Sequence, residues 1–394
     1  MLYSVKAPRQ HSPHPTPSET SQNPPIQPPG QSNISEQILE RLSGDQISEK
    51  FDSAVKDGMS PEIAIIEIMN KYNIDINDLH KTLSEKGLNV SFSKVKYKEI
   101  AHYVGLDHVK RFNDAVLFDL YRSRVPNVIF RSIVEDIDML ILQYGPLMDQ
   151  ANEEATSRTL SPIFNRLVAI FEHAIINEHE SIIYGRLTTK GRIEYHFKTF
   201  GAVAILFVEV KHLIRSLNDK MDAIGQVIAE CDACDWSNVS SNIHVPIYGI
   251  LCDAVGFSFF RFNGSASKPD RFTGGYYPDG NTDTRRFSII PIFPTVPKPL
   301  GFLISLRIIT ELVFDIMLAA YCESLVVFRD RSQAEVSRGR PRKSLANWEE
   351  AIKHAESARV KFRAAETKRK ESLPDEADAI CDEAYNDLKS RYNF

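Results

Sequence analysis

Glu209 and Lys211 are the residues of this sequence whose types and spacing best suit a chemical reaction. They form the triplet Glu209-Val210-Lys211, which directly follows the apolar run AVAILFV. Side chains alternate along a strand, so both residues are expected to project to the same face. A carboxylate there can bind Mg²⁺, which prefers oxygen ligands, and the lysine can offset charge that develops on a phosphate. The triplet suits phosphodiester hydrolysis, but taken alone it is more typical of a surface ion pair.

Three further polar residues are expected to lie close to this triplet. Glu194 is on the preceding predicted strand, Glu172 is on the helix before the sheet, and Gln226 is on the helix that follows. The continuous apolar run before Glu209 indicates a central strand that is covered on both faces. The predicted order is a helix that starts at Ser161-Pro162, strands over 181–187, 192–199 and 202–211, a helix over 219–230, and strands over 245–252 and 257–262.

This combination resembles the PD-(D/E)XK nuclease superfamily, which has an acid on the second strand, E-x-K on the third and a glutamine on the next helix. The segments FKTFGAVAILFVEVK, DAIGQVIAECDACDW and VPIYGILCD are similar to fungal members of the superfamily and to the nuclease-like domains of crinkler-type effectors. The resemblance implies a restriction-endonuclease-like core and a Mg²⁺-dependent nuclease that acts on nucleic acid, in the first place DNA. It also implies that Lys211 and Gln226 are catalytic and that Mg²⁺ or Mn²⁺ is held by Glu172, Glu194 and Glu209.

Two positions depart from the pattern of the superfamily. Glu194 stands where an aspartate is usual, and Ile193 stands where a proline is frequent. The longer glutamate side chain carries its carboxylate one methylene further out, so a metal ion would have to shift or bind more weakly. The sequence therefore leaves two functions open. One is an active nuclease, and the other is a catalytically degenerate nuclease-like fold that acts as a DNA-binding or protein-interaction module.

A short basic segment is a second candidate site for nucleic acid. Arg338-Gly339-Arg340-Pro341-Arg342 matches the R-G-R-P core of an AT-hook, and Lys343 extends the charge. Such a segment lays its arginines into a narrow, A/T-rich minor groove. The predicted DNA contacts are therefore Arg338, Arg340, Arg342 and Lys343. A nuclear import signal and a solvated linker are the alternatives.

The sequence predicts a mixed α/β protein whose core is flanked by helical regions. Residues 1–33 hold eight of the 21 prolines and few large apolar residues, which is typical of a disordered tail. The predicted regions are this Pro-rich tail at 1–33, a helical accessory region at 34–158, a core with extra strands at 159–298, a packed apolar helix at 299–329, an extended basic connector at 330–344 and a helical hairpin at 345–394.

The predicted apolar helix carries three charges at intervals of four residues, Arg307, Glu311 and Asp315. This spacing places them on one helical face. A span that faces lipid needs about 18–20 apolar residues with few or no charges. The pattern therefore predicts an amphipathic helix with one wet stripe, and not a membrane span.

Composition limits the compartment and the kinds of site. The net charge is −5, so any contact with nucleic acid must come from local basic patches. Five cysteines, an odd number, do not suggest a disulfide framework. Cys231 and Cys234 form a C-x-x-C motif without the second pair that a structural zinc site needs, so two buried thiols are expected. The N-terminal residues show no apolar signal-peptide core. We expect an intracellular protein of the nucleus or cytoplasm.

Overall fold

A mixed β-sheet with helices on both faces forms the core of the protein. The computed structural model describes residues 52–59, 63–64, 67, 91–109, 112, 114–188, 191–278, 285–292, 299–338 and 347–390. The predicted disordered tail, residues 1–33, lies outside the described residues. Residues 45–394 form one compact unit.

The main sheet has the strand order β1-β9-β8-β7-β6-β5-β2, and β10 pairs with β8. β6 carries the sequence VAILFVEV, and all eight of its residues are buried. β3 (Ser181–Ile183) and β4 (Gly191–Ile193) form a separate two-stranded sheet. The strands of the main sheet are β1 (Leu117–Asp119), β2 (Ile175–Asn177), β5 (Tyr195–Thr199), β6 (Val203–Val210), β7 (Ile247–Cys252), β8 (Gly256–Phe262), β9 (Phe272–Tyr276) and β10 (Ile289–Pro291).

The directions of the central strands follow from their connections. β2, β5 and β6 are antiparallel neighbours. After β6 the chain returns through α8 (Leu217–Ser240), and β7 then runs parallel to β6. A parallel pair needs such a crossover connection, commonly a helix. β8 pairs antiparallel with β7, and β9 pairs antiparallel with β8. β1 lies at the edge of the sheet, parallel to β9.

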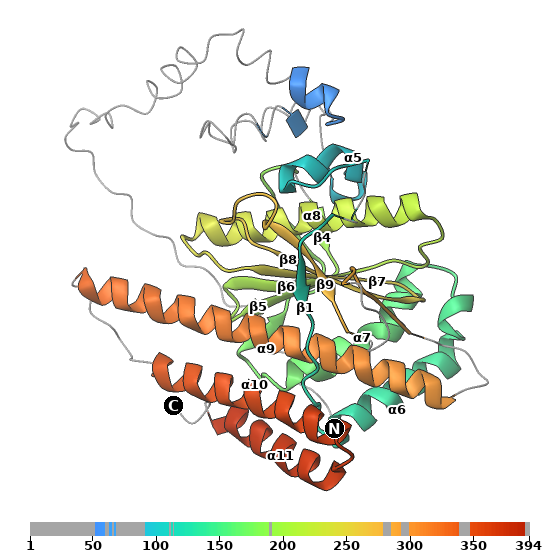
Figure 1. Cartoon of the computed structure of the whole chain (residues 1–394), viewed down its shortest axis with the longest axis vertical. Helices are drawn as coiled ribbons and strands as arrows, with labels where there is room; N and C mark the ends of the chain where they lie inside the picture. Colours follow the sequence, from blue (N-terminus) through green and yellow to red (C-terminus); the bar gives the residue numbers. More distant parts are fainter. Residues whose placement is uncertain are drawn as a thin grey trace, which may run out of the picture. The chain divides into compact units, whose positions relative to one another are not determined.

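α8 covers one face of the main sheet, whereas α7 and α9 lie on the other (Figure 1). Two hydrophobic clusters fill the two layers, one on the α8 side and one between the sheet and α9. On the α9 side, α6 packs against α7, and the antiparallel pair α10 and α11 packs against α9. The other helical elements are η1 (Phe92–Lys94), α5 (Tyr97–Ile100), η2 (Ala101–Val104), α6 (Asn127–Tyr144), η3 (Leu147–Asp149), α7 (Glu153–Ala169), α9 (Pro299–Ser337), α10 (Trp348–Lys370) and α11 (Pro374–Ser390).

α7 begins earlier than the sequence indicated. Its first residue is Glu153, and Asn152 caps its N terminus with the side-chain oxygen. The predicted start, Ser161-Pro162, lies inside the helix. Pro162 has no N–H to bond with the carbonyl of Arg158, and the Ser161 hydroxyl donates to that carbonyl instead, at 2.8 Å. Two helix-start residues are therefore accommodated in the middle of a helix.

The first strand of the sheet is also misplaced in the sequence-based prediction. Residues 181–187 were expected to fill this role, but β3 pairs only with β4, and β2 takes the place beside β5. β2 begins at Ile175, before the first predicted strand. α7 ends at Ala169, and Glu172 then adopts a φ of 50°, which turns the chain out of the helical direction.

Two strands occur where none was predicted. β1 comes from the predicted helical region at 34–158, and β9 comes from a Gly-rich part of the predicted core. The glycines of β9 reflect close packing: a Cβ at Gly274 would lie 2.6 Å from the Phe112 ring, and one at Gly275 would lie 2.8 Å from Leu120. Glycine within a strand often marks such a close approach. Because glycine is also frequent in loops, the sequence of β9 resembles that of a loop.

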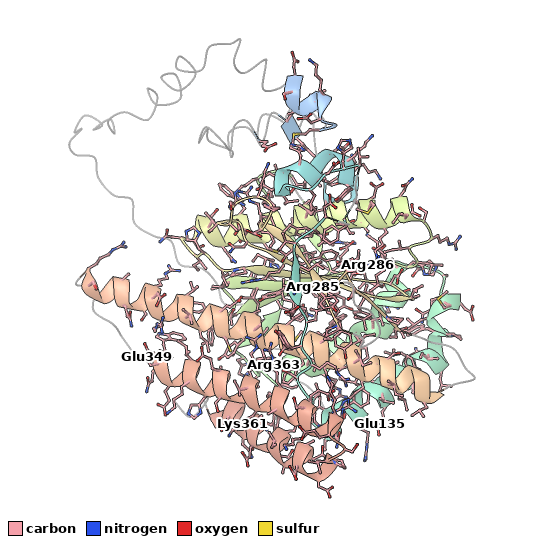
Figure 2. All side chains as sticks on the ribbon, in the orientation of Figure 1. Glu135, Arg285, Arg286, Glu349, Lys361 and Arg363 are labelled. Carbon is pink, nitrogen blue, oxygen red and sulfur yellow. The ribbon has the colours of Figure 1, made fainter. Side chains whose placement is uncertain are left out.

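α9 differs from the prediction in two respects. Its charged stripe is not wet, because Glu311 is fully buried and Asp315 is 4% exposed. Arg363 of α10 binds Asp315 at 2.7 Å, and Figure 2 shows Arg363 at the junction of the two helices. The helix also continues to Ser337, so residues 330–337 are helical where an extended connector was expected. The predicted C-terminal hairpin is present as α10 and α11.

None of the helices in the described residues, α9 included, combines the length and the apolar character that crossing a bilayer requires.

Candidate active site

The triplet predicted from the sequence lies at the end of β6. The Lys211 Nζ atom donates to Glu209 Oε1 at 2.5 Å, and the Gln226 Nε2 atom donates to the same oxygen at 2.6 Å. Gln226 also donates to Glu230 Oε1 at 2.8 Å. The structure thus brings together Glu209, Lys211 and Gln226, as predicted, and adds Glu230.

Local folding explains why these residues meet. The backbone N–H of Lys211 donates to Cys252 of β7 at 2.8 Å, so the lysine continues the strand pairing beyond β6. A capping box between Ser216 and Asp219 starts α8 a few residues later. α8 then runs back along β6. Gln226 and Glu230 are four residues apart, so they share the helical face that contacts Glu209.

Glu194 lies opposite the same strand end. The register pairs Tyr195 with Val208, and one further step places Glu194 opposite Glu209. Cross-strand neighbours of this kind have Cβ atoms about 5 Å apart. Burial, followed by the charges of Glu209 and Glu153, raises the pKa of Glu194 to about 8. The backbone of Val210 donates a hydrogen bond to the Glu194 carboxylate, yet its Oε2 atom is buried without a partner in the described part of the chain.

Glu172 does not join this group. The carbonyl of nearby Ala174 accepts a hydrogen bond from Phe200, just before β6 begins. Glu209 lies at the other end of β6, roughly 20 Å away at about 3.3 Å per residue. The acid that α7 does supply is Glu153, whose Oε2 atom is 3.6 Å from Lys211 Nζ. The predicted role of Glu172 as a ligand therefore does not fit its position.

The end of β6 holds more acids than bases. Burial raises the pKa of Glu209, and the ion pair with Lys211 only partly offsets this effect. Burial, and then the charge of Glu209, raises the pKa of Glu230 well above the ordinary range. The Glu230 Oε2 atom is buried, and a side-chain hydrogen bond with Glu209 contributes to the raised pKa of Glu230. We expect Glu230 to be held as the neutral acid, and Lys211 is the cation that contacts both Glu209 and Glu153.

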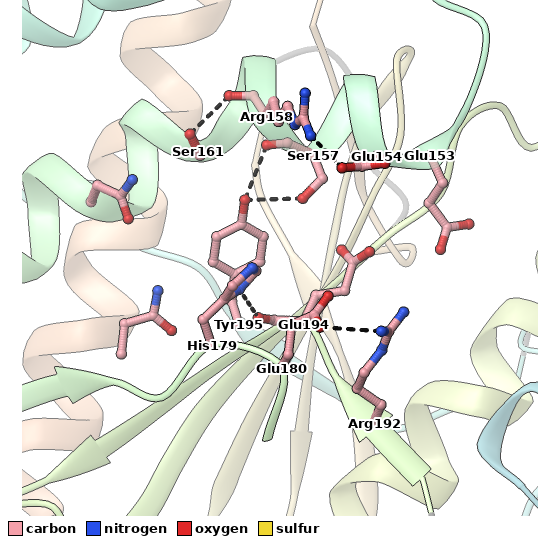
Figure 3. Close-up of a pocket in the computed structure, with 12 residues that line it drawn as sticks. Glu153, Glu154, Ser157, Arg158, Ser161, His179, Glu180, Arg192, Glu194 and Tyr195 are labelled. Carbon is pink, nitrogen blue, oxygen red and sulfur yellow. Dashed lines mark hydrogen bonds and ion pairs between the residues drawn. The ribbon is translucent and has the colours of Figure 1, made fainter. Parts of the chain in front are cut away.

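A cavity of about 810 Å³ opens beside Glu194, between α7 and the strands β2 and β5. Figure 3 shows α7 residues on one side, and His179, Glu180, Arg192, Glu194 and Tyr195 on the other. The cavity gives solvent a route to Glu194. Its lining residues are Glu153, Glu154, Ser157, Arg158, Ser161, Asn165, Asn177, His179, Glu180, Arg192, Glu194 and Tyr195.

Several carboxylates close together do not by themselves form a metal site. Within the described ranges, no group of three or more His, Cys, Asp or Glu side chains is arranged to hold a metal ion. Cys231 and Cys234 of the C-x-x-C motif are both fully buried within α8, and burial raises the pKa of each thiol. They are the buried thiols that the sequence predicted. All five cysteines of the chain are buried as thiols.

The predicted AT-hook falls at the edge of the described residues. Arg338 is exposed in a turn directly after α9. Arg340, Arg342 and Lys343 lie outside the described residues. α9 ends just before Gly339 and Pro341, the two residue types that most strongly disfavour a helix interior.

Sequence reasoning missed two acids at the end of β6, for different reasons. Glu230 had a local signal, because it follows Gln226 by one helical turn and so shares its face. Glu153 had none, since its assignment depends on where α7 begins, and Ser161-Pro162 indicated a later start. Tyr195 and Ser157, whose hydroxyl oxygens are 3.0 Å apart, were likewise missed because they belong to the cavity and not to the triplet.

A scan against protein-family models finds no matching family, and a search of curated proteins finds no relative of this chain.

Proposed function

We propose that this protein is a Mg²⁺-dependent nuclease that hydrolyses phosphodiester bonds in DNA, with Mn²⁺ as a substitute ion. The observation that carries the proposal is the set of contacts at the end of β6. Lys211 and Gln226 both bind Glu209 there, and Glu194 lies on the neighbouring strand. The order α7, β2, β5, β6, α8, β7, with β7 parallel to β6, supports a restriction-endonuclease-like core.

The donor chemistry fits a hard divalent cation. Glu194, Glu209 and Glu153 are carboxylates, the ligands that Mg²⁺ prefers, and the buried Oε2 atom of Glu194 lacks a partner among the described residues. To hold the ion, these three residues, with Glu153 in place of Glu172, would have to turn towards one another, because within the described residues no three such side chains are already arranged as a metal site. When bound, Mg²⁺ would polarise a phosphate and lower the pKa of a water molecule.

The remaining residues have roles that follow from their contacts. Lys211 carries the positive charge nearest to Glu209, and it can offset charge that develops on a phosphate oxygen. Gln226 fixes the orientation of Glu209 through its amide, because the same amide is anchored on Glu230 at 2.8 Å. Thr156, on the first turn of α7, lies 3.4 Å from His212 Nδ1 and links the start of that helix to the residue after Lys211.

A catalytically degenerate fold is the second candidate, and one observation favours it. Glu209 Oε1 already accepts hydrogen bonds from both Lys211 and Gln226, so one of the expected metal ligands is internally satisfied. In that case the protein would act as a DNA-binding or protein-interaction module. In an active nuclease and in a DNA-binding module alike, the basic segment would contact DNA through Arg338, Arg340, Arg342 and Lys343.

A metal titration combined with a cleavage assay distinguishes the two candidates. We expect Mg²⁺ and Mn²⁺ to bind the wild type more tightly than Glu209→Ala in calorimetry. We also expect Glu209→Gln and Lys211→Ala each to abolish cleavage of DNA, while Lys211→Ala still binds metal. The nuclease proposal fails if the wild type binds metal no better than Glu209→Ala and cleaves neither DNA nor RNA, in single- or double-stranded form.

The basic segment requires its own experiment. Neutralising Arg338, Arg340 and Arg342 together should weaken DNA binding. It should also reduce the slope of log affinity against log salt by about 0.9 for each DNA phosphate that the variant no longer neutralises. Unchanged affinity combined with loss of nuclear accumulation would identify the segment as an import signal.

A further inference from the structure

The cavity beside Glu194 extends well beyond the catalytic residues. Glu153, the first residue of α7, lines the cavity, and so does Asn165, which lies twelve residues later on the same helix. Twelve helical residues span about 18 Å. A volume of about 810 Å³ is within the range of pockets that enclose small organic ligands, roughly 300–1,000 Å³. The cavity is therefore large enough for a substrate group in addition to a metal ion.

The charges around this cavity largely cancel in pairs. Arg158 pairs with Glu154 within α7, and Arg192 pairs with Glu180 at 3.1 Å. All four side chains are at least half exposed, so the pairs lie at the rim and are weak and exchangeable. The remaining lining residues include the acids Glu153 and Glu194, which disfavour an anionic group, and the uncharged polar residues Ser157, Tyr195, Asn165 and Asn177. The interior thus suits an uncharged group that forms hydrogen bonds, and not a phosphate.

Asn177 supplies an observation that the fold alone does not explain. Its carboxamide oxygen is buried and has no hydrogen-bond partner in the described part of the chain. Leaving a buried polar atom unsatisfied typically costs about 1–3 kcal/mol, so such an atom calls for an explanation. The residue lies on β2 and lines the cavity. A rotation of this side chain about its χ angles would turn the oxygen towards the cavity, where a ligand would supply the missing donor.

His179 adds a second fixed hydrogen-bonding group. Its Nδ1 atom lies 2.6 Å from the backbone carbonyl of Glu194, so Nδ1 carries the proton and donates. In the neutral ring this leaves Nε2 as an acceptor. The cavity therefore combines amide donors and acceptors with a ring acceptor and hydroxyl groups. A nucleobase edge presents the complementary mixture of donors and acceptors.

We infer that this cavity binds one unpaired base of the nucleic-acid chain next to the scissile phosphate, so that the substrate is single-stranded or locally unpaired. The inference rests on the proposed nuclease function. A base within a duplex is stacked and its pairing edge is occupied, so it would first have to leave the helix. Arg158 and Arg192 at the rim can exchange their carboxylate partners for the flanking phosphates. Amide side chains such as Asn165 and Asn177 are well suited to hydrogen-bond to a base.

The test measures binding without cleavage, by fluorescence anisotropy in EDTA. The probes are a labelled single-stranded DNA 12-mer, its blunt duplex and the single-stranded RNA of the same sequence. To remove duplex binding by the basic segment, the test uses the full-length protein with Arg338, Arg340 and Arg342 replaced by glutamine. We expect this protein to bind the single strands more tightly than the duplex, and the RNA arm shows whether DNA is preferred. Asn177→Leu should weaken single-strand binding by about 5- to 150-fold, which corresponds to the ~1–3 kcal/mol of a good amide–base contact.

The stability of the variant separates a binding role from a structural one. Asn177→Leu removes an unsatisfied polar atom, so its thermal stability should be unchanged or higher. Asn165→Ala tests the opposite wall if the first variant does not fold. Asn218→Leu is the matched control, because Asn218 is exposed on α8 outside the cavity, and it should bind as the wild type does.

The outcomes distinguish this inference from the nuclease proposal. Single-strand binding that depends on Asn177, in a protein that does not cleave with Mg²⁺, would keep the base site and reject the nuclease. Cleavage that is accompanied by equal or tighter duplex binding, with Asn177→Leu and Asn165→Ala unaffected, would reject the base site and keep the nuclease. The inference would also be overturned if the protein bound none of the three probes.

Discussion

Two regions of this protein bury several carboxylates, and they treat them in opposite ways. Between α9 and α10 the buried acids are held by arginines. Arg122 donates to Glu311 through Nε and Nη2, at 2.9 and 2.6 Å, and Arg363 binds both oxygens of Asp315 at 2.7 Å. Arg122 also pairs with Glu366 at 3.0 Å. Buried charges held in this way are compensated within the fold itself.

At the end of β6 the compensation is incomplete. Glu209 and Glu230 are buried and Glu194 is half-buried, and the pKa of each is raised, with burial as the largest cause. Lys211 is the nearby cation, and the buried Oε2 atom of Glu194 has no partner within the described ranges. A fold gains nothing in stability from unpaired buried acids. The difference indicates that the first region is structural and supports the proposal that the second binds a cation from solution.

The largest stability effect should come from breaking the compensated region. Arg122→Met leaves Glu311 without its main partner while keeping most of the side-chain volume, so the free energy of unfolding should fall by about 3–5 kcal/mol. Urea denaturation measures this. Arg131→Met, at an exposed position of α6, is the control and should change it by less than about 0.5 kcal/mol. A decrease below about 1 kcal/mol for Arg122→Met would mean that the network is not structural.

A matched pair of substitutions compares the two regions directly. Glu311→Gln removes a charge that Arg122 and Arg307 bind, and we expect the free energy of unfolding to fall by at least about 2 kcal/mol at pH 7. Glu230→Gln replaces a neutral acid by a neutral amide of similar size, and we expect a change below about 1 kcal/mol. Equal decreases in the same urea experiment would remove the distinction between the regions.

The pH dependence of stability should report on Glu194. Its pKa is about 8 in the folded protein and near 4.5 when unfolded. Because the folded pKa is raised, the contribution is fully present below pH 4.5 and is lost as pH rises towards 8. The wild type should therefore become progressively less stable than Glu194→Gln over this window, with no further change above it. Thermal unfolding at several pH values measures the difference, and parallel curves would contradict the assignment.

The smallest effects concern conservative changes at the acids. Glu194→Asp shortens the acid by one methylene while keeping its charge. Under the proposed nuclease function, Mg²⁺-dependent cleavage should hold or rise in a fluorescent-substrate assay. Glu172→Gln is exposed and distant from the end of β6 that carries Glu209, and it should alter neither cleavage nor stability by a measurable amount. A drop in cleavage for Glu172→Gln would restore this residue to the site that the sequence first predicted.

Sequence reasoning worked best where local pattern determines structure. The apolar run before Glu209 is a fully buried central strand, and the Glu209, Lys211 and Gln226 contacts follow from strand alternation and helix position. The C-terminal helical pair was equally clear, because Pro374 marks the break between its helices.

The remainder depended on tertiary contacts that no local pattern carries. Pro162 indicated a helix start, but the Ser161 hydroxyl bonds to the carbonyl that Pro162 leaves free, so α7 extends back to Glu153. This shift replaced Glu172 by Glu153 as the acid of α7. The charged stripe of α9 was expected to be wet, and only the arginines of other elements, such as Arg122, explain its burial.

The five buried cysteines allow local opening of the fold to be measured by thiol modification. The thiols are spread over the fold, with Cys231 and Cys234 in α8, and Cys252, Cys322 and Cys381 in β7, α9 and α11. A thiol reagent reacts with the exposed thiolate, so modification requires the surrounding element to open. The order in which the thiols react under native conditions would therefore rank the opening free energies of the layers. Such a ranking would show whether the α8 side, which holds Gln226 and Glu230, opens independently of the α9 side.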